Sequence, residues 1–223
     1  MVFHPNQLFH IYNQGNNNQT IFFTDENYEY FIWKMQTYLL PFGDLISYCL
    51  MPTHFHWQFY VEKIDLDRKT LRERVDQIEW IRRSKKYGAE AITVDAQSKR
   101  TASGDSRVTL NESIGILQNA YARSINKEKG WSGSVFRKEC KAKDGCVDEA
   151  LSLIKNGKVD YRFTNMNNYD LTCFEYIHNN PREARLVDQS TDWFYSSALD
   201  YAGIRENSIC NLDLGRKILE LDF

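Results

Sequence analysis

Hydrophobic and polar positions follow two different periods along the chain, and each period predicts one kind of element. Residues 8–12, LFHIY, form a short aromatic-rich run typical of a strand, and alternating apolar residues in the two runs that flank Met51-Pro52-Thr53 are typical of a hairpin. Elsewhere apolar residues recur every three or four positions. This spacing predicts four longer helices, at about residues 24–40, 64–87, 109–126 and 169–180.

The stretches between these elements have weaker patterns. Residues 88–107 are small and polar and lack the apolar side chains that packing requires, so we expect a flexible loop there. Residues 134–143, SVFRKECKAK, alternate like a strand with one basic face. We also expect a helix at about residues 144–155, a loop over 156–168, and a short helix near 214–221.

The order of these elements predicts an α+β fold. Strand, helix, hairpin, helix, strand and helix in succession indicate an antiparallel sheet covered by helices, close to a ferredoxin-like arrangement. The sequence has no internal repeats. We expect a single domain over residues 1–203 with an insertion at about 64–108, followed by a C-terminal tail over 204–223 that ends in the short helix.

Composition narrows the class of protein. With 223 residues, 42% of them hydrophobic, the chain is long enough to bury a substantial core. No apolar run approaches the roughly 18 residues that span a bilayer, and the polar start MVFHPNQ lacks the order of a signal peptide, so we expect a cytoplasmic protein with no membrane partner. Five cysteines without a CxxC pair favour reduced thiols over a disulfide framework or a zinc knuckle.

Charge gives a local signal and no global one. The net charge of −2 does not indicate nucleic-acid binding, because phosphate recognition usually leaves a basic footprint. Basic residues are clustered, however, where Arg137 and Lys138 precede Lys141 and Lys143. Such clusters are most often solvated surface, and contact with a phosphate backbone is the alternative.

The second strand of the expected hairpin carries two histidines that could hold a metal. His54 and His56 are two residues apart, so both imidazoles project from one face while Phe55, Trp57 and Phe59 project from the other. Two neutral imidazoles side by side form half of a metal site, although histidines on a sheet are more often hydrogen-bonded structural residues. The next alternating position is glutamine, which disfavours a histidine-triad hydrolase.

Four segments resemble a family of DNA-processing enzymes. CLMPTHFHWQFYV is similar to the histidine-hydrophobic-histidine signature of HUH nucleases, and EYIHNNPREARLV with DWFYSSALDY resembles the tyrosine helix and tail of single-tyrosine transposases. FHIYNQGNNNQTIFF and GWSGSVFRKECKAK also resemble family segments, so the resemblance covers most of residues 8–203. The pattern is most similar to transposase-like proteins associated with repetitive extragenic palindromes.

The resemblance implies an activity and the residues for it. It implies an HUH nuclease of ferredoxin-like (RRM-like) fold that cuts single-stranded or hairpin DNA and forms a 5′-phosphotyrosine intermediate. Tyr176 is then the catalytic nucleophile, and His54, His56 and Asn180 hold a divalent metal, Mg²⁺ or Mn²⁺. Positions i and i+4 share a helix face, so Tyr176 and Asn180 could both approach the histidines. Asn180 precedes Pro181, however, and capping of the helix end is its alternative role.

Other assignments stay open at this point. Arg137 and Lys138 are candidate DNA-backbone contacts, and His178 is interpreted as a structural residue or a DNA contact, with metal ligation as a lesser alternative. The aromatic residues Tyr12, Trp57 and Phe59 are interpreted as core, with stacking of unpaired bases as the alternative. Family members act as monomers or homodimers, and the sequence does not decide between them. The alternatives to a nuclease are a DNA-binding protein of the same fold without cleavage and a structural metal-binding protein that never meets DNA.

Overall fold

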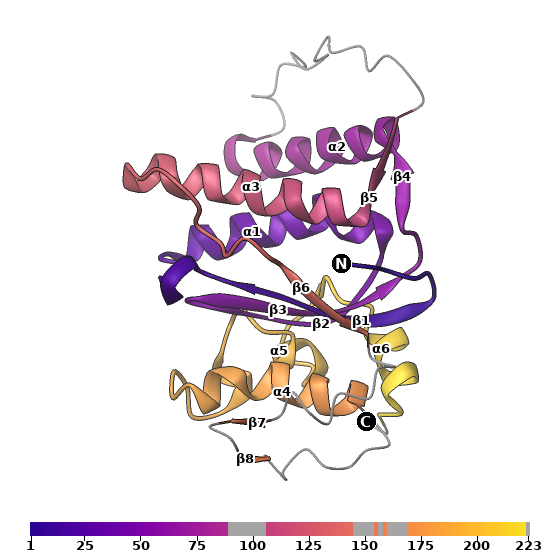
Figure 1. The fold of residues 1–223 in the computed structure, drawn as a ribbon, viewed down its shortest axis with the longest axis vertical. Coiled ribbons are helices and arrows are strands. Elements are labelled where there is room, and N and C mark those ends of the chain that lie inside the picture. Colours follow the sequence, from indigo (N-terminus) through magenta and orange to yellow (C-terminus); the bar gives the residue numbers. More distant parts are fainter. Residues whose placement is uncertain (89–105, 145–153, 156–157, 160–168, 222–223) are drawn as a thin grey trace.

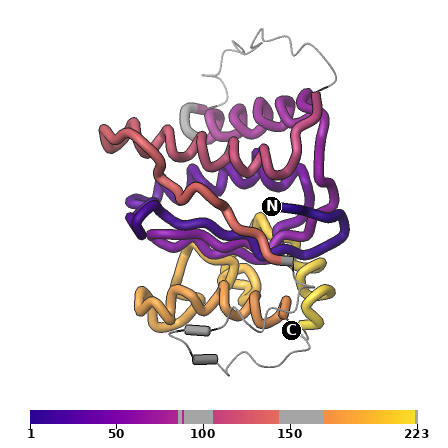
Figure 2. The backbone as a smooth tube through the Cα atoms, viewed as in Figure 1, coloured from indigo at the N-terminus to yellow at the C-terminus, as the bar shows by residue number. Residues whose placement is uncertain are grey.

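The molecule consists of a sheet between two layers of helices. A computed structural model describes residues 1–88, 106–144, 154–155, 158–159 and 169–221. Helices α1 and α3 cover one face of the sheet with α2 packed on α1 on the same side, whereas α4, α5 and α6 lie on the other face (Figure 1). The tube in Figure 2 shows that the chain completes the first helical layer and then runs from α3 to the sheet through the segment that precedes β6.

The sheet has four antiparallel strands in the order β2-β3-β1-β6. Their bounds are Gln7–Gln14 for β1, Gly43–Met51 for β2, His54–Val61 for β3 and Lys141–Asp144 for β6. The crossover helices α1 (Asp25–Tyr38) and α3 (Leu110–Lys129) pack on the same face of this sheet. This topology is the ferredoxin-like arrangement that the order of elements predicts.

The other elements extend the two helical layers. They are η1 (Asn16–Asn18), η2 (Leu40–Phe42), β4 (Asp65–Asp67), α2 (Arg68–Tyr87), β5 (Arg107–Thr109), β7 (Ile154–Lys155), β8 (Lys158–Val159), α4 (Tyr169–Glu183), η5 (Ser190–Asp192), α5 (Ala198–Tyr201) and α6 (Leu212–Leu219). The hairpin and all four longer helices predicted from periodicity are present, although the helix expected from residue 64 begins at Arg68, after β4. Asp67 caps α2 by accepting a hydrogen bond from the Lys69 N–H at 2.6 Å.

The strand expected over residues 134–143 is mostly wrong. Only its end lies in the sheet, as β6. Val135 and Phe136 are consecutive and both buried, so period-two alternation is lost there. Their backbone bonds the loop after β1, since the Val135 carbonyl accepts from the Asn16 N–H at 2.9 Å.

Two further expectations are wrong or fall outside the described residues. The helix expected at 144–155 fails at both ends: Asp144 belongs to β6, and Ile154–Lys155 pairs with Lys158–Val159 as a small hairpin that satisfies its own backbone groups. Residues 145–153 and most of the loop expected at 156–168 lie outside the described residues, as does 89–105 of the loop expected at 88–107.

Helix α4 continues through Pro181, where the sequence predicts a stop. A proline lacks the N–H that bonds the carbonyl four residues earlier, so it removes one helical hydrogen bond. Pro181 sits in the last turn, and the turn closes beyond it because the Ala184 N–H donates to the Asn180 carbonyl at 2.9 Å. Asn180 therefore has a helical position, and its side chain is not a cap.

The two faces of β3 carry different kinds of residue. Phe55, Trp57 and Phe59 are fully buried in the large core under α1 and α3, as their alternation predicts. The assignment of Tyr12 to the core is wrong, because Tyr12 lies on the opposite face and is only half-buried.

None of the helices among the described residues has the length and apolar content to cross a membrane.

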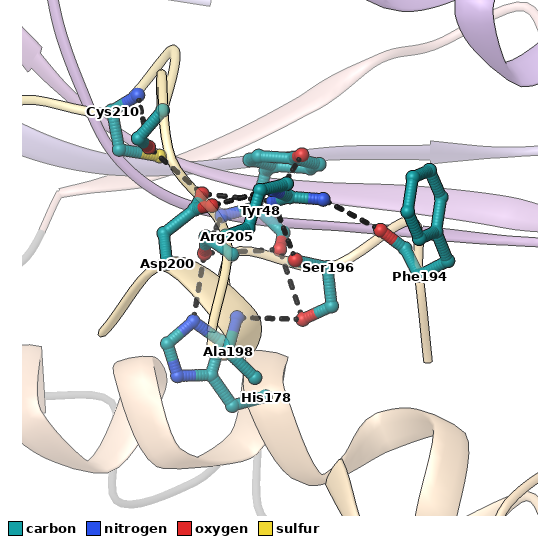
Figure 3. Close-up of polar contacts among 10 residues, drawn as sticks. Tyr48, His178, Phe194, Ser196, Ala198, Asp200, Arg205 and Cys210 are labelled. Atoms are coloured by element: carbon teal, nitrogen blue, oxygen red, sulfur yellow. Dashed lines mark hydrogen bonds and ion pairs between the residues drawn. The ribbon is translucent and has the colours of Figure 1, made fainter. Parts of the chain in front are cut away.

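The segment after α4 covers the outer edge of β2. The Leu50 N–H donates to the Tyr195 carbonyl at 2.9 Å, and the Asn211 N–H donates to the Leu45 carbonyl at 2.9 Å. Arg205 fixes this segment by pairing with the buried carboxylate of Asp200 (Figure 3). At the opposite edge of the sheet, β6 pairs with β1 on one side and with no further strand of the described residues on the other.

Candidate active site

Two histidines of β3 form the centre of a polar cluster on the face that α4 covers. The ring centroids of His54 and His56 are 5.0 Å apart, and the ring planes are nearly perpendicular, at 85°. Their strand lies between β2 and β1, and His56 is directly opposite Tyr12 of β1. Because opposite residues of an antiparallel pair project to the same side, β1 contributes side chains to this cluster as well.

His56 is buried and is contacted by a third histidine. Its Nδ1 lies 2.9 Å from Nε2 of His10, and the two rings stack with centroids 5.1 Å apart. Tyr12 stacks against both imidazoles, at 4.9 Å from His10 and 5.7 Å from His56. The other nitrogen of His56, Nε2, is buried and has no hydrogen-bond partner among the described residues.

His54 connects the hairpin to helix α4. Its Nδ1 lies 2.9 Å from the Thr53 hydroxyl, and its Nε2 lies 3.3 Å from Oδ1 of Asn180. In both histidines, therefore, Nδ1 has a partner from the sheet or its turn. Nε2 is the nitrogen left for a ligand in His56 and the nitrogen that meets α4 in His54.

Helix α4 presents Tyr176 and Asn180 to the histidines because its apolar side is fixed to β2. Cys173 and Ile177 of α4 are buried in one cluster with Cys49 of β2, and Tyr176 packs against that cluster. Residues i and i+4 lie on the same side of a helix, so Asn180 follows Tyr176 toward the sheet. The structure thus brings together the four residues that the family resemblance implies.

The ring of Tyr176 lies against two of the imidazoles. Its centroid is 5.3 Å from that of His56 at an interplanar angle of 83°, and 6.3 Å from that of His10 at 72°. Both contacts are edge-to-face, an arrangement that aromatic rings prefer. Tyr176 is half-buried and not enclosed in the core.

Burial sets the protonation states in this cluster. It lowers the pKa of His54 and lowers the pKa of His56 well below its usual value, and burial together with nearby Lys143 lowers the pKa of His10 to about 3. Burial also raises the pKa of Tyr176, partly offset by a hydrogen bond with Asn180. At neutral pH the cluster therefore contains neutral imidazoles and a protonated phenol.

The donor atoms of this cluster fit a divalent cation. The described residues include no group of three or more His, Cys, Asp or Glu that could hold a metal, so the donors here are two imidazoles and one amide oxygen. The buried Nε2 of His56 carries either a lone pair or a proton, and it has no hydrogen-bond partner among the described residues. If it carries a lone pair, a cation would be a suitable partner for it. Three protein donors leave coordination positions open for water or phosphate oxygens.

The expected DNA contacts Arg137 and Lys138 are not part of this cluster. Both are exposed and line an open cavity of about 720 Å³ between α3 and residues 133–140, a cavity that includes none of the histidines of the cluster. Arg137 donates from Nη2 to the Asn18 side chain at 3.1 Å.

The register of β6 supplies basic residues that the sequence reasoning did not assign to the site. Lys141 is opposite Tyr12 and Lys143 is opposite His10, so both lysines lie on the histidine face at the edge of the sheet. His10 was missed as well. The strand expected over residues 8–12 puts His10 and Tyr12 on one face, because every second side chain of a strand projects to the same side.

His178 has a structural position. It is buried, and its Nε2 lies 2.7 Å from the Ser197 hydroxyl. A second anchor of the helix is Gln58, whose side-chain N–H donates to the Asp170 carbonyl at 2.7 Å. These two contacts join α4 to the tail and to β3, and both lie outside the cluster around His56.

Comparison with known proteins gives one structural likeness. No protein-family model matches the chain, and no curated protein matches it in sequence. The chain is similar to a solved structure described as the REP associates tyrosine transposase bound to a REP hairpin, with 11% sequence identity and a TM-score of 0.45, over 94% of this chain and 87% of that chain.

Proposed function

We propose that the protein is a metal-dependent endonuclease and strand transferase for single-stranded DNA, with Tyr176 as its nucleophile. The observation that carries this proposal is the convergence of Tyr176 and Asn180 with His54 and His56 on one sheet face. Two imidazoles, an amide and a phenol in contact form a set suited to phosphodiester chemistry.

The reaction is an exchange of phosphate esters. The phenol oxygen of Tyr176 attacks the phosphorus atom, a bond forms between them, and the bond from phosphorus to the 3′ oxygen breaks. The phenol loses its proton, the 3′ oxygen gains one, and the 5′ phosphate remains on the tyrosine. A divalent cation, Mg²⁺ or Mn²⁺, held by His54, His56 and Asn180 supplies polarisation of the phosphate oxygens.

Because burial raises the pKa of Tyr176, its phenol is protonated at neutral pH. A phenol is a poor nucleophile until it is deprotonated, so the reaction requires a group that promotes loss of this proton. The neutral imidazoles beside it add no positive charge of their own that would favour the phenolate. Metal dependence is therefore an expected property of this geometry.

The substrate path follows the basic residues of the sheet edge. Lys141 is exposed and lies in the same cross-strand row as Tyr12 and His56, so a DNA backbone that crosses β6 meets a lysine before it reaches the histidines. Tyr12 offers a ring on which an unpaired base could stack. Arg137 and Lys138 are proposed to contact flanking DNA outside the cluster.

Binding without cleavage is the second candidate function. Burial raises the pKa of Tyr176, and a phenol that stays protonated is a poor nucleophile, which favours binding over cleavage. In that case the histidine cluster stabilises the fold, and the surface near β6 recognises folded DNA by shape.

Covalent trapping separates these two functions. The protein is incubated with single-stranded hairpin DNA labelled at its 3′ end, with Mn²⁺ or Mg²⁺, and analysed under denaturing conditions. We expect a labelled adduct in the wild type, none in Tyr176→Phe, and an unchanged adduct in Tyr60→Phe, a matched control at the other end of β3. DNA binding without any adduct under either metal would contradict cleavage and support the binding function.

A further inference from the structure

The buried His10 has no part in the proposed reaction, yet it contacts one of the proposed metal ligands directly. Its Nε2 lies 2.9 Å from Nδ1 of His56, compared with 3.3 Å between His54 and Asn180. It comes from β1, a different strand, and is 8% exposed. A buried imidazole at this distance from another must share one proton with it, so its presence constrains the state of His56.

Only two arrangements of that proton are possible between neutral rings. Either His10 donates from Nε2, which places the proton of His56 on its own Nε2, or His56 donates from Nδ1, which leaves a lone pair on its Nε2. The first arrangement buries an N–H of His56 without an acceptor among the described residues. Buried N–H donors without acceptors are costly and rarer than acceptors without donors, so the second arrangement is favoured.

We propose that His10 is a positioning residue for the metal site: it accepts the Nδ1–H of His56 and thereby keeps the lone pair of His56 on Nε2, the atom that binds the cation. This inference rests on the proposed function, because it presumes that His56 is a ligand. It does not require that cleavage occurs. A metal-ligating histidine generally donates its second N–H to a partner that fixes its tautomer and ring orientation.

The sheet holds His10 in the position that this role requires. His10 lies opposite Gln58 on β3 and Lys143 on β6, so its backbone is fixed from both sides by strand pairing. Tyr12 stacks on its ring with an interplanar angle of 29°, and His56 stacks on it at 26°. The imidazole of His10 is therefore held between neighbouring rings and cannot swing away from Nδ1 of His56 without breaking these contacts.

Metal affinity of matched variants tests the proposal. Mn²⁺ binding to the metal-free protein is measured by calorimetry for the wild type, His10→Phe, which keeps a ring but no acceptor, and His10→Gln, whose side-chain oxygen can accept in place of Nε2. We expect His10→Phe to bind Mn²⁺ about 10- to 100-fold more weakly and His10→Gln to recover most of the affinity. Asn13→Leu is the control, because Asn13 is buried on the same strand but bonds Gln118 on the other face.

The tautomer of His56 gives a readout that needs neither metal nor activity. Long-range ¹H–¹⁵N spectra of the metal-free wild type are expected to show His56 protonated on Nδ1 and unprotonated on Nε2, and this test does not depend on whether a variant folds. A wild type protonated on Nε2, or a folded His10→Phe that binds Mn²⁺ as tightly as the wild type, overturns the role of His10. Absence of Mn²⁺ binding in the wild type contradicts the metal site itself, which is a different result.

Discussion

The imidazole Nε2 of His178 lies 2.7 Å from the Ser197 hydroxyl, and the same hydroxyl accepts a hydrogen bond from the Tyr48 N–H at 2.9 Å. Ser197 thus joins helix α4, the C-terminal tail and the edge strand β2. Tyr176 is two residues before His178 on the same helix. The position of the proposed nucleophile therefore depends on a contact made well away from the histidines of β3.

Replacing Ser197 is expected to disturb catalysis as well as stability. Ser197→Ala leaves a buried histidine nitrogen and a buried backbone N–H without this partner, which should lower the free energy of unfolding by about 1–3 kcal/mol. The rate of adduct formation should fall more than tenfold, because small misplacement of a nucleophile is costly. Urea denaturation and adduct kinetics measure both effects.

Ser113→Ala provides the matched control for that experiment. Ser113 is also a buried serine, and it donates to the Tyr38 carbonyl at 2.6 Å, on the α1 and α3 side of the sheet. It should lose similar stability while keeping the adduct rate of the wild type. Equal adduct rates in both variants would show that the Ser197 contact does not position Tyr176.

The ion pair of Asp200 and Arg205 is expected to hold the tail on β2. The Asp200 carboxylate is buried and receives Arg205 Nη2 at 2.8 Å, while the same guanidinium donates to the Ser196 carbonyl and the Tyr48 hydroxyl (Figure 3). Arg205→Met leaves a buried carboxylate unpaired and should cost about 3–5 kcal/mol. Adding Asp200→Asn should recover part of that loss in urea denaturation. No recovery in the double variant would mean that the charge of Asp200 is not the cause.

Lys141 is expected to contribute to DNA binding next to the site. Lys141→Gln should weaken binding of single-stranded DNA, and it should make the slope of log affinity against log salt shallower by about 0.7, the change that removal of one neutralised phosphate produces. Lys127→Gln, an exposed lysine at the end of α3, is the control. Titrations at several salt concentrations measure the slope, and equal slopes in all three proteins would exclude a phosphate interaction with Lys141.

Alkaline pH should destabilise the fold through buried tyrosines. Tyr121 is fully buried and donates to the Ile21 carbonyl at 2.6 Å, and burial raises its pKa above the usual 10. The unfolded chain then loses this proton first, so stability is complete below pH 10 and falls as pH rises above it, by about 1.4 kcal/mol at pH 11 for one such residue. Urea denaturation at pH 8 and pH 11 should show a smaller loss for Tyr121→Phe than for the wild type. An equal loss would mean that Tyr121 ionises normally in the fold.

Local periodicity was sufficient for the main elements and for the division of β3 into two faces. His54 and His56 were separated correctly from Trp57 because a strand alternates strictly, and the ferredoxin-like order followed from the succession of elements. Helix α4 was found from its apolar spacing. Its true end, beyond Pro181, depends on a backbone bond in the last turn that no residue pattern shows.

The pairing of strands that are far apart in the chain could not be predicted from the sequence. His10 contacts His56 because β1 pairs with β3, and Lys141 joins the same face because β6 pairs with β1 in one register out of several. The tail residues that hold α4 show no regular spacing of apolar residues, because their hydrogen bonds go to the edge of β2. These partners of the site are visible only when the sheet is assembled.

The identity of the residue that becomes linked to DNA shows whether Tyr176 is the nucleophile. After reaction with hairpin DNA and Mn²⁺, the protein is digested with nuclease and protease, and the peptide that carries a nucleotide phosphate is sequenced by mass spectrometry. We expect a 5′-phosphodiester on Tyr176, absent when His54 and His56 are both replaced by alanine. A linkage to another residue, or DNA that is bound and never becomes covalently attached, would contradict it.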